Sequence, residues 1–87
     1  MTSHEFRVSE TVANSILSGR KRFDVQPACL EVQTGDEVNF VATDIHNLKT
    51  YHEVNKRRYA VTYVYAGRGL KDGFMVLGFE EVMRDAR

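Results

Sequence analysis

Two short basic runs and a series of tyrosines are the side chains of this chain that could bind a nucleic acid. Arg20-Lys21-Arg22 and Lys56-Arg57-Arg58 would form a patch for a phosphate backbone if the fold brought them side by side. Tyr59, Tyr63 and Tyr65 could stack on bases. Both patterns also have structural explanations, because runs of three charges are common on solvated faces and alternating tyrosines often form a barrel wall.

The histidines, the cysteine and the glycines match no known metal or phosphate motif. His4, His46 and His52 lie in different segments and lack the close spacing of a zinc site. Cys29 is the only cysteine, which excludes an intramolecular disulfide and a cysteine-based zinc site. No Gly-Lys-Ser/Thr follows the glycines of 67–69, so we interpret them as turn residues. We expect neither a metal nor a cofactor.

The composition predicts one small globular domain over residues 1–87. Hydrophobic residues make up 43% of the chain, which supports a packed core and argues against disorder. Twelve basic and twelve acidic residues cancel, unlike the basic excess that is usual in duplex binders. No apolar run approaches the ~20 residues of a membrane span. With a lone cysteine as well, we expect a cytoplasmic protein without membrane contact.

Hydrophobic periodicity predicts a strand, one helix and then four further strands. Residues 4–8 form the first strand, and Ser9 caps a helix with an apolar face that ends at Gly19. A second strand covers 21–26 and ends at a turn containing Pro27, and a third follows the turn at 34–36.

Residues 43–55 are polar and predict a loop before the last two strands. Strands are expected at 57–66, with Tyr59, Val61, Tyr63 and Tyr65 on one face, and at 74–82. One helix cannot cover both faces of five strands. The pattern therefore predicts a mainly β, α+β fold, a small five-stranded mixed β-barrel with one N-terminal helix. We expect a core containing Ile16, Leu17, Phe23, Phe40, Val61, Val64, Val76 and Leu77.

The segment from Leu17 to Val25 resembles the signature of ASCH domains, which belong to the PUA-like superfamily. In that signature a glycine and a lysine end the first helix, and the next strand carries an acid. Four other segments resemble a family of small uncharacterised ASCH-like proteins of bacteria and phages: His4–Val8, Gln33–Val38, Arg58–Val64 and Gly73–Gly78. The similarity covers residues 4–82, the expected domain core.

The resemblance implies a cleft between the helix end and the barrel mouth that binds RNA, a nucleotide or a modified nucleoside. Lys21, Asp24 and Gln26 would surround this cleft, and Gln26 stands where the family usually has an arginine. Lys21 and Asp24 would form an ion pair in the pocket, or else face solvent and a neighbouring strand. Asp24 and Gln26 share a strand face and could read the polar edge of a flat ligand. We also expect Arg20 and Tyr63 to contact the ligand, and Arg22, Arg57 and Arg58 to contact phosphates.

Some small ASCH proteins are amidohydrolases that act on acylated cytidine with a lysine and a threonine three residues later. Lys21 matches that lysine, but Asp24 occupies the threonine position, and a carboxylate cannot replace a hydroxyl nucleophile. Thr62, on a nearby strand, is the one residue that could supply a substitute hydroxyl. We therefore expect a binding module rather than an enzyme. The alternatives are such a hydrolase, or a phage-type accessory protein that binds a host protein. We expect a monomer or weak dimer.

Overall fold

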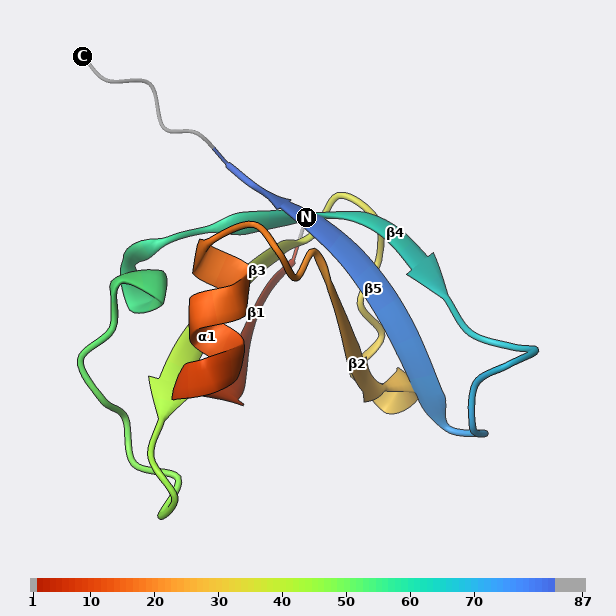
Figure 1. Ribbon diagram of the computed structural model, residues 1–87. Helices are drawn as coiled ribbons and strands as arrows, with labels where there is room; N and C mark the ends of the chain where they lie inside the picture. Colours follow the sequence, from red (N-terminus) through yellow and green to blue (C-terminus); the bar gives the residue numbers. More distant parts are fainter. Residues whose placement is uncertain (1, 83–87) are drawn as a thin grey trace.

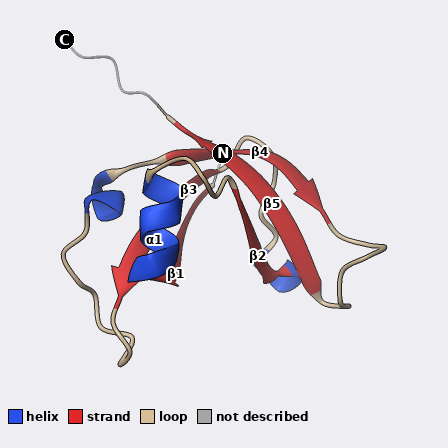
Figure 2. Ribbon diagram, in the orientation of Figure 1, coloured by secondary structure: helices blue, strands red, loops and turns tan. Residues whose placement is uncertain are grey.

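The computed structural model describes residues 2–82, which form a single curled sheet with one α-helix (Figure 1). The elements in chain order are β1 (Ser3–Ser9), α1 (Glu10–Leu17), β2 (Phe23–Pro27), the 3₁₀ turn η1 (Ala28–Leu30), β3 (Glu37–Thr43), the 3₁₀ turn η2 (Glu53–Lys56), β4 (Tyr59–Tyr65) and β5 (Phe74–Glu81). The predicted order of strand, helix and four strands is confirmed. Figure 2 shows that strands dominate this mainly β, α+β fold.

The sheet is a five-stranded, mixed half-barrel with the strand order β1-β3-β4-β5-β2. β1 runs parallel to β3, and the other neighbours are antiparallel. The pairing of β3 with β4 is short, because it joins only Glu37 to Ala60 and Val38 to Tyr59. The molecule therefore has two halves. One contains β1 and β3 with α1, and the other contains β2 and β5. β4 connects them (Figure 1).

The single helix begins and ends as the sequence predicts. The Ser9 side chain accepts a hydrogen bond from the Val12 amide at 3.2 Å and so caps the first turn. Gly19 follows the helix with φ +85°, a left-handed conformation that costs glycine little. The helix packs against β1, β3 and η2. No helix within residues 2–82 is long and apolar enough to cross a membrane.

Four of the eight residues expected in the core are buried, and the other four are not. Ile16, Phe40, Val61 and Leu77 are buried, whereas Leu17, Val64 and Val76 are half-buried. Phe23 is 50% exposed, so its predicted burial is wrong. The alternation along β2 was correctly predicted but assigned to the wrong faces. Residues opposite one another in a ladder share a face, and Asp24, not Phe23, lies opposite the buried Leu77.

A β-bulge in β4 divides its apolar residues between the two faces of the sheet. Val61 pairs with Phe79 and Tyr63 pairs with Gly78, which leaves Thr62 as an extra residue. The extra residue reverses the alternation, so Tyr59 and Val61 are buried while Tyr63 is 66% exposed. The prediction that Tyr59, Val61, Tyr63 and Tyr65 share one face is therefore wrong. A Cβ atom on Gly78 would lie 3.2 Å from Thr62 Oγ1, so glycine leaves room for the bulge.

Asp36 ties the N-terminal strand to the junction between β3 and β4. Its carboxylate lies 2.9 Å from His4 Nε2 and accepts hydrogen bonds from the amides of Gln33 at 2.9 Å and Thr2 at 3.1 Å. Its carbonyl accepts a 2.8 Å hydrogen bond from the Val61 amide. The hydrogen bond to His4, followed by that from Gln33, lowers the pKa of Asp36 from 3.8 to about 2.

We predict that truncating Ile16 destabilises the protein more than truncating Leu17. Ile16 is only 2% exposed, so Ile16→Ala should lower the free energy of unfolding by about 2–5 kcal/mol. Leu17 is half-buried, and Leu17→Ala should cost about 1–2 kcal/mol. Urea denaturation of both variants measures the difference. A larger loss for Leu17→Ala would mean that the helix is rotated from the orientation described.

We also predict that Asp36 makes the protein sensitive to acid. Because folding lowers the pKa of Asp36, its ionised form stabilises the fold above pH 3.8, and this contribution is lost as the pH falls through about 2. Asp36→Asn should be less stable at neutral pH and should lose less stability between these two pH values. Urea midpoints measured across this range test the prediction, and parallel curves for the two proteins would contradict it.

Candidate functional site

A cleft lies where the end of α1 faces β5, and we call it the helix-end cleft. Its volume is about 330 Å³, and it is lined by Ile16, Leu17, Ser18, Gly19, Lys21, Arg22, Tyr59, Phe79, Glu80 and Glu81. The chain turns back after the helix because the Lys21 amide donates a 3.0 Å hydrogen bond to the Ser15 carbonyl. The Phe79 amide then donates to the Arg22 carbonyl at 3.0 Å, which fixes the next residues against β5.

Tyr59 lines this cleft and carries a buried hydroxyl. The residue is 3% exposed, and its buried hydroxyl has no hydrogen-bond partner within residues 2–82. Burial, and to a lesser extent the charge of Glu81, raises the pKa of Tyr59 above its ordinary value of 10.0. The hydroxyl is therefore protonated at neutral pH and can donate. Buried polar groups normally have partners, so an unpaired hydroxyl at a cleft wall calls for an explanation.

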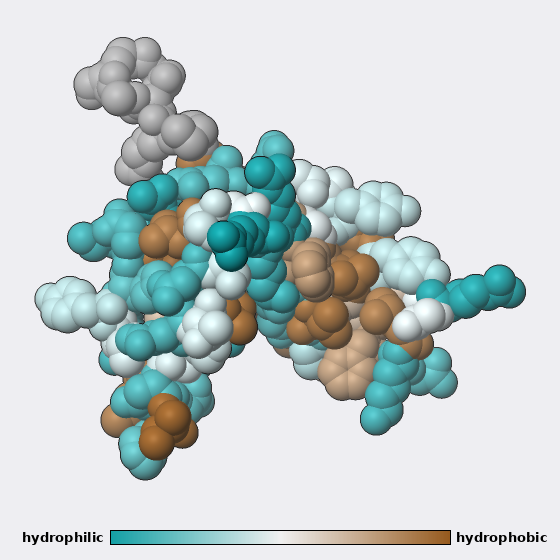
Figure 3. Space-filling view, viewed as in Figure 1, coloured by the Kyte–Doolittle hydropathy of each residue, from teal (hydrophilic) through white to brown (hydrophobic). Residues whose placement is uncertain are grey.

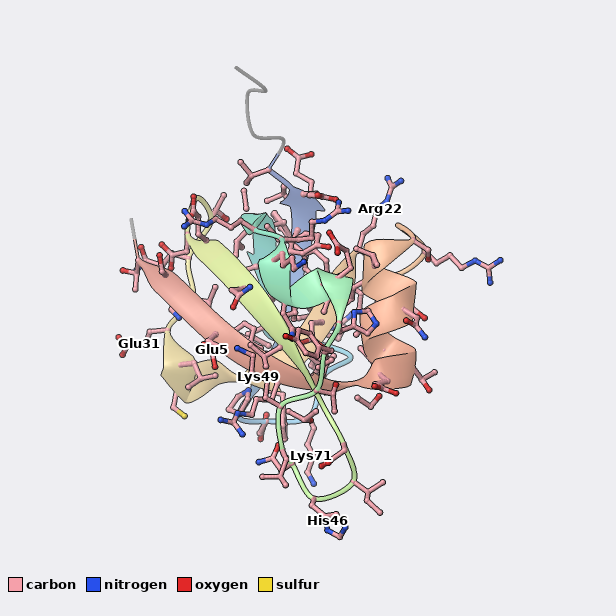
Figure 4. All side chains as sticks on the ribbon, turned by 90° about the vertical axis from the view of Figure 1, so that its left-hand side faces the viewer. Glu5, Arg22, Glu31, His46, Lys49 and Lys71 are labelled. Carbon is pink, nitrogen blue, oxygen red and sulfur yellow. The ribbon has the colours of Figure 1, made fainter. Side chains whose placement is uncertain are left out.

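Two residues of the first basic run lie at the cleft. Lys21 and Arg22 line it, and the Arg22 side chain donates from Nε to the Gly19 carbonyl at 3.0 Å. Lys21 Nζ lies 4.1 Å from the ring centroid of Phe23, a cation–π geometry. Arg20 is exposed. Figure 4 shows Arg22 beside the end of the helix.

Asp24 and Gln26 form a pair, but not with Lys21. Gln26 donates from Nε2 to Asp24 Oδ2 at 2.7 Å, and both side chains are half-buried. They face the concave side of the sheet, since they lie opposite the buried Leu77 and Met75. Lys21 instead contacts Phe23, which faces the convex side. Within residues 2–82 no ion pair joins Lys21 to Asp24, and neither Asp24 nor Gln26 lines the helix-end cleft.

The second basic run is engaged by carboxylates. Arg57 lies 2.6 Å from Glu81 and 3.5 Å from Glu53, and Arg58 lies 3.6 Å from Glu37. The hydrogen bond from Arg57 to Glu81 raises the pKa of Arg57. A phosphate at Arg57 or Arg58 would have to displace these partners, and binding by these two residues remains a prediction.

The two basic runs meet at the same end of β5. The Arg22 carbonyl accepts from the Phe79 amide at 3.0 Å, and the Arg58 carbonyl accepts from the Val82 amide at 2.8 Å. Glu80 and Glu81 lie between these contacts, which weakens the attraction of this end for a polyanion. The two runs therefore lie near the same end of β5, with acidic side chains between them.

Two of the three histidines form hydrogen bonds that have a structural role. His4 contacts Asp36, while His52 lies 2.7 Å from the Asn14 side-chain oxygen and accepts from the Val54 amide at 3.0 Å. Their rings are thereby used to hold the N-terminal strand and η2 in place.

Sequence reasoning placed Lys21 at the cleft but missed Tyr59, Glu80 and Glu81. The sequence pattern groups Tyr59 with the other tyrosines of its strand, and only the bulge separates it from them. Glu80 and Glu81 belong to the expected last strand, and their position opposite the helix end depends on long-range pairing. No local signal in the sequence marks any of the three as a cleft residue.

Comparisons with known proteins reveal a relation of fold. No family model matches the chain, and no curated protein matches it. Among solved structures, it is similar to the crystal structure of hypothetical protein PH0355, with a TM-score of 0.61 and 12% sequence identity. The alignment covers 93% of this chain and 100% of that one. The shared feature is the fold alone.

We predict that Tyr59→Phe stabilises the unliganded protein. Removing a buried hydroxyl that has no partner within residues 2–82 relieves a desolvation penalty, so the free energy of unfolding should rise by about 1 kcal/mol. Tyr65→Phe is the matched control, because the Tyr65 hydroxyl donates to the Arg68 carbonyl at 2.7 Å. That variant should be equally stable or slightly less stable than wild type. Urea denaturation compares them, and a loss of stability in Tyr59→Phe would show that its hydroxyl is already satisfied.

Proposed function

We propose that the chain is a non-catalytic module that binds a nucleoside or nucleotide, either free or within RNA, in the helix-end cleft. The observation that carries the proposal is the Tyr59 hydroxyl, which is buried, is protonated and has no partner within residues 2–82, on a residue that lines a cleft of about 330 Å³. Small-molecule sites typically start at about 300 Å³ and combine apolar walls with a few polar groups. A ligand that accepts a hydrogen bond from Tyr59 would satisfy its hydroxyl.

The lining of the cleft matches the separate parts of a nucleotide. Ile16, Leu17 and Phe79 supply apolar surface for a base. Lys21 and Arg22 at the rim supply positive charge for a phosphate, which Arg binds in bidentate fashion. Glu80 and Glu81 can accept hydrogen bonds from ribose hydroxyls or an exocyclic amine.

The resemblance to ASCH domains supports the same location, because it places the ligand between the helix end and the barrel mouth. We infer that the chain belongs to that PUA-like group and acts in the cytoplasm, where the exposed thiol of Cys29 would stay reduced. Asp24 and Gln26 are assigned a secondary role. Their paired side chains on the concave face would contact a ligand only if it extends beyond the cleft.

A binding screen with the four ribonucleoside monophosphates tests the proposal. At about 100 times its dissociation constant, a ligand should stabilise the protein by ~2.7 kcal/mol in a thermal-shift assay. Tyr59→Phe should weaken binding about tenfold, equivalent to ~1.4 kcal/mol, because it removes the hydrogen-bond donor. Tyr51→Phe is the matched control, since Tyr51 is fully exposed and does not line the helix-end cleft.

Two outcomes would contradict this function. The first is that no ribonucleoside monophosphate binds to the wild-type protein. The second is that Tyr59→Phe and Tyr51→Phe change the affinity equally, which would place the ligand elsewhere.

A further inference from the structure

The convex face of β2, β4 and β5 carries a continuous apolar and aromatic surface. The strand register places Phe23, Gly78 and Tyr63 in one row across the three strands, and Val25, Val76 and Tyr65 in the next. Phe74 and Pro27 form a third row. The five large side chains among them are 39–66% exposed: Phe23, Val25, Tyr63, Tyr65 and Phe74. We call these five residues, with Val76, the convex aromatic surface.

No helix covers this surface in the part of the chain that the structure describes. The helix α1 packs against β1, β3 and η2, which belong to the other half of the sheet or its flank. Figure 3 shows apolar side chains gathered over β2 and β5, with hydrophilic side chains around them. The rows from Gly78 to Phe74 span four residues of β5, or about 13 Å. Such a patch of exposed aromatic residues is characteristic of an interaction site.

Basic side chains lie at both ends of the convex aromatic surface. Arg20, Lys21 and Arg22 precede β2 at one end, and Arg68 and Lys71 belong to the β4–β5 connection at the other. Figure 4 shows Arg22 and Lys71 at opposite ends of the molecule. The hydrogen bond from the Tyr65 hydroxyl to the Arg68 carbonyl fixes the connection to the surface.

These five basic residues differ from those of the second run in forming no ion pair within residues 2–82, although Glu80 and Glu81 line the cleft beside Lys21 and Arg22, and Asp72 follows Lys71. None of them forms an ion pair with a carboxylate of residues 2–82, whereas Lys56, Arg57 and Arg58 all do. Five of the seven basic residues of 2–82 that form no ion pair lie at the ends of the aromatic surface, and the other two are Arg7 and Lys49.

We infer that the convex aromatic surface binds single-stranded nucleic acid, with unpaired bases stacked on Phe23 and Tyr63 and phosphates held at the two basic ends. Aromatic rings flanked by positive charge are the combination that binds single strands without sequence preference. A duplex keeps its bases stacked on one another and would leave the rings unused. A second copy of the chain is a poorer fit, because packing in either orientation would bring basic ends together.

This surface is distinct from the site of the proposed nucleotide-binding function. Phe23 and Tyr63 do not line the helix-end cleft, and Tyr59 points to the opposite face of β4 because of the bulge. Lys21 and Arg22 lie at the boundary, since both line the cleft and the Lys21 amine lies over the Phe23 ring. Variants of Tyr59 and Tyr63 can therefore separate the two activities.

Fluorescence anisotropy with an oligouridylate of about eight nucleotides tests the inference. Wild type should bind at about 50 mM salt and more weakly at about 200 mM. Phe23→Leu and Tyr63→Ser should each weaken binding about ten- to hundredfold, the loss expected for one stacked base. Tyr51→Ser, which removes a more exposed tyrosine from another surface, should bind like wild type. Arg68→Gln should reduce the salt slope by about 0.7.

The same proteins provide the outcomes that would overturn the inference. It fails if wild type does not bind the oligouridylate, if it binds a duplex of equal length as tightly, or if Phe23→Leu and Tyr63→Ser bind like wild type. An equal loss of oligouridylate affinity in Tyr59→Phe would assign the strand to the helix-end cleft. A dimer in sedimentation that Tyr63→Ser dissociates would assign the surface to a second copy. Because Phe23 and Tyr63 are exposed, both variants should keep the wild-type melting temperature.

Discussion

The packing of three aromatic rings at the junction between the two halves of the sheet is the interaction on which the structure depends. Phe40 of β3 lies with its ring centroid 5.5 Å from Tyr59 of β4 and 4.9 Å from Phe79 of β5, and the last two are 5.3 Å apart. The contacts are edge-on or tilted, which is the favourable geometry for aromatic pairs. Since β3 and β4 share so short a ladder, these rings supply the apolar contact that holds the curl.

The same packing determines the properties of the cleft. It fixes the Tyr59 ring in the core, and no side chain within residues 2–82 pairs with its buried hydroxyl. A small domain has little stability to spare, so an unpaired buried hydroxyl is a measurable burden on the free protein. Its presence is understandable if a ligand completes the hydrogen bond. This gives a physical link between the core of the fold and the proposed site.

The bulge at Thr62 gives the protein its second surface. Without the extra residue, the alternation that buries Tyr59 and Val61 would also bury Tyr63 and Tyr65. With it, both tyrosines face outward and join Phe23 and Phe74. One inserted residue thus separates a packed core from an exposed aromatic surface on the same strand. Bulges are known to redirect side chains in this way.

Local signals in the sequence predicted most of the fold and only part of the site. Ser9, Gly19 and the alternation of each strand act over a few residues, so they located the helix and all five strands. The bulge could not be predicted, because the run from Tyr59 to Tyr65 alternates without interruption. Val54 was placed in a polar loop, yet it is fully buried, since η2 packs against β3 and α1.

For the site, the position of Lys21 after the helix end was accessible from the sequence. The unpaired state of the Tyr59 hydroxyl could not be predicted, because it depends on which distant residues fold close to it. The sequence also could not predict on which face of the sheet Phe23 and Asp24 lie. They follow from pairing with β5, about fifty residues further along the chain.

The most direct measurement is a titration of isotope-labelled protein with a ribonucleoside monophosphate, followed through the backbone amide chemical shifts. Binding in the helix-end cleft predicts that the largest shifts occur at Gly19, Lys21, Tyr59 and Phe79, with a smaller response in the loop that contains Tyr51. Shifts that are confined to the loop, or the absence of any shift at saturating ligand, would contradict the assignment of the cleft as the nucleotide site.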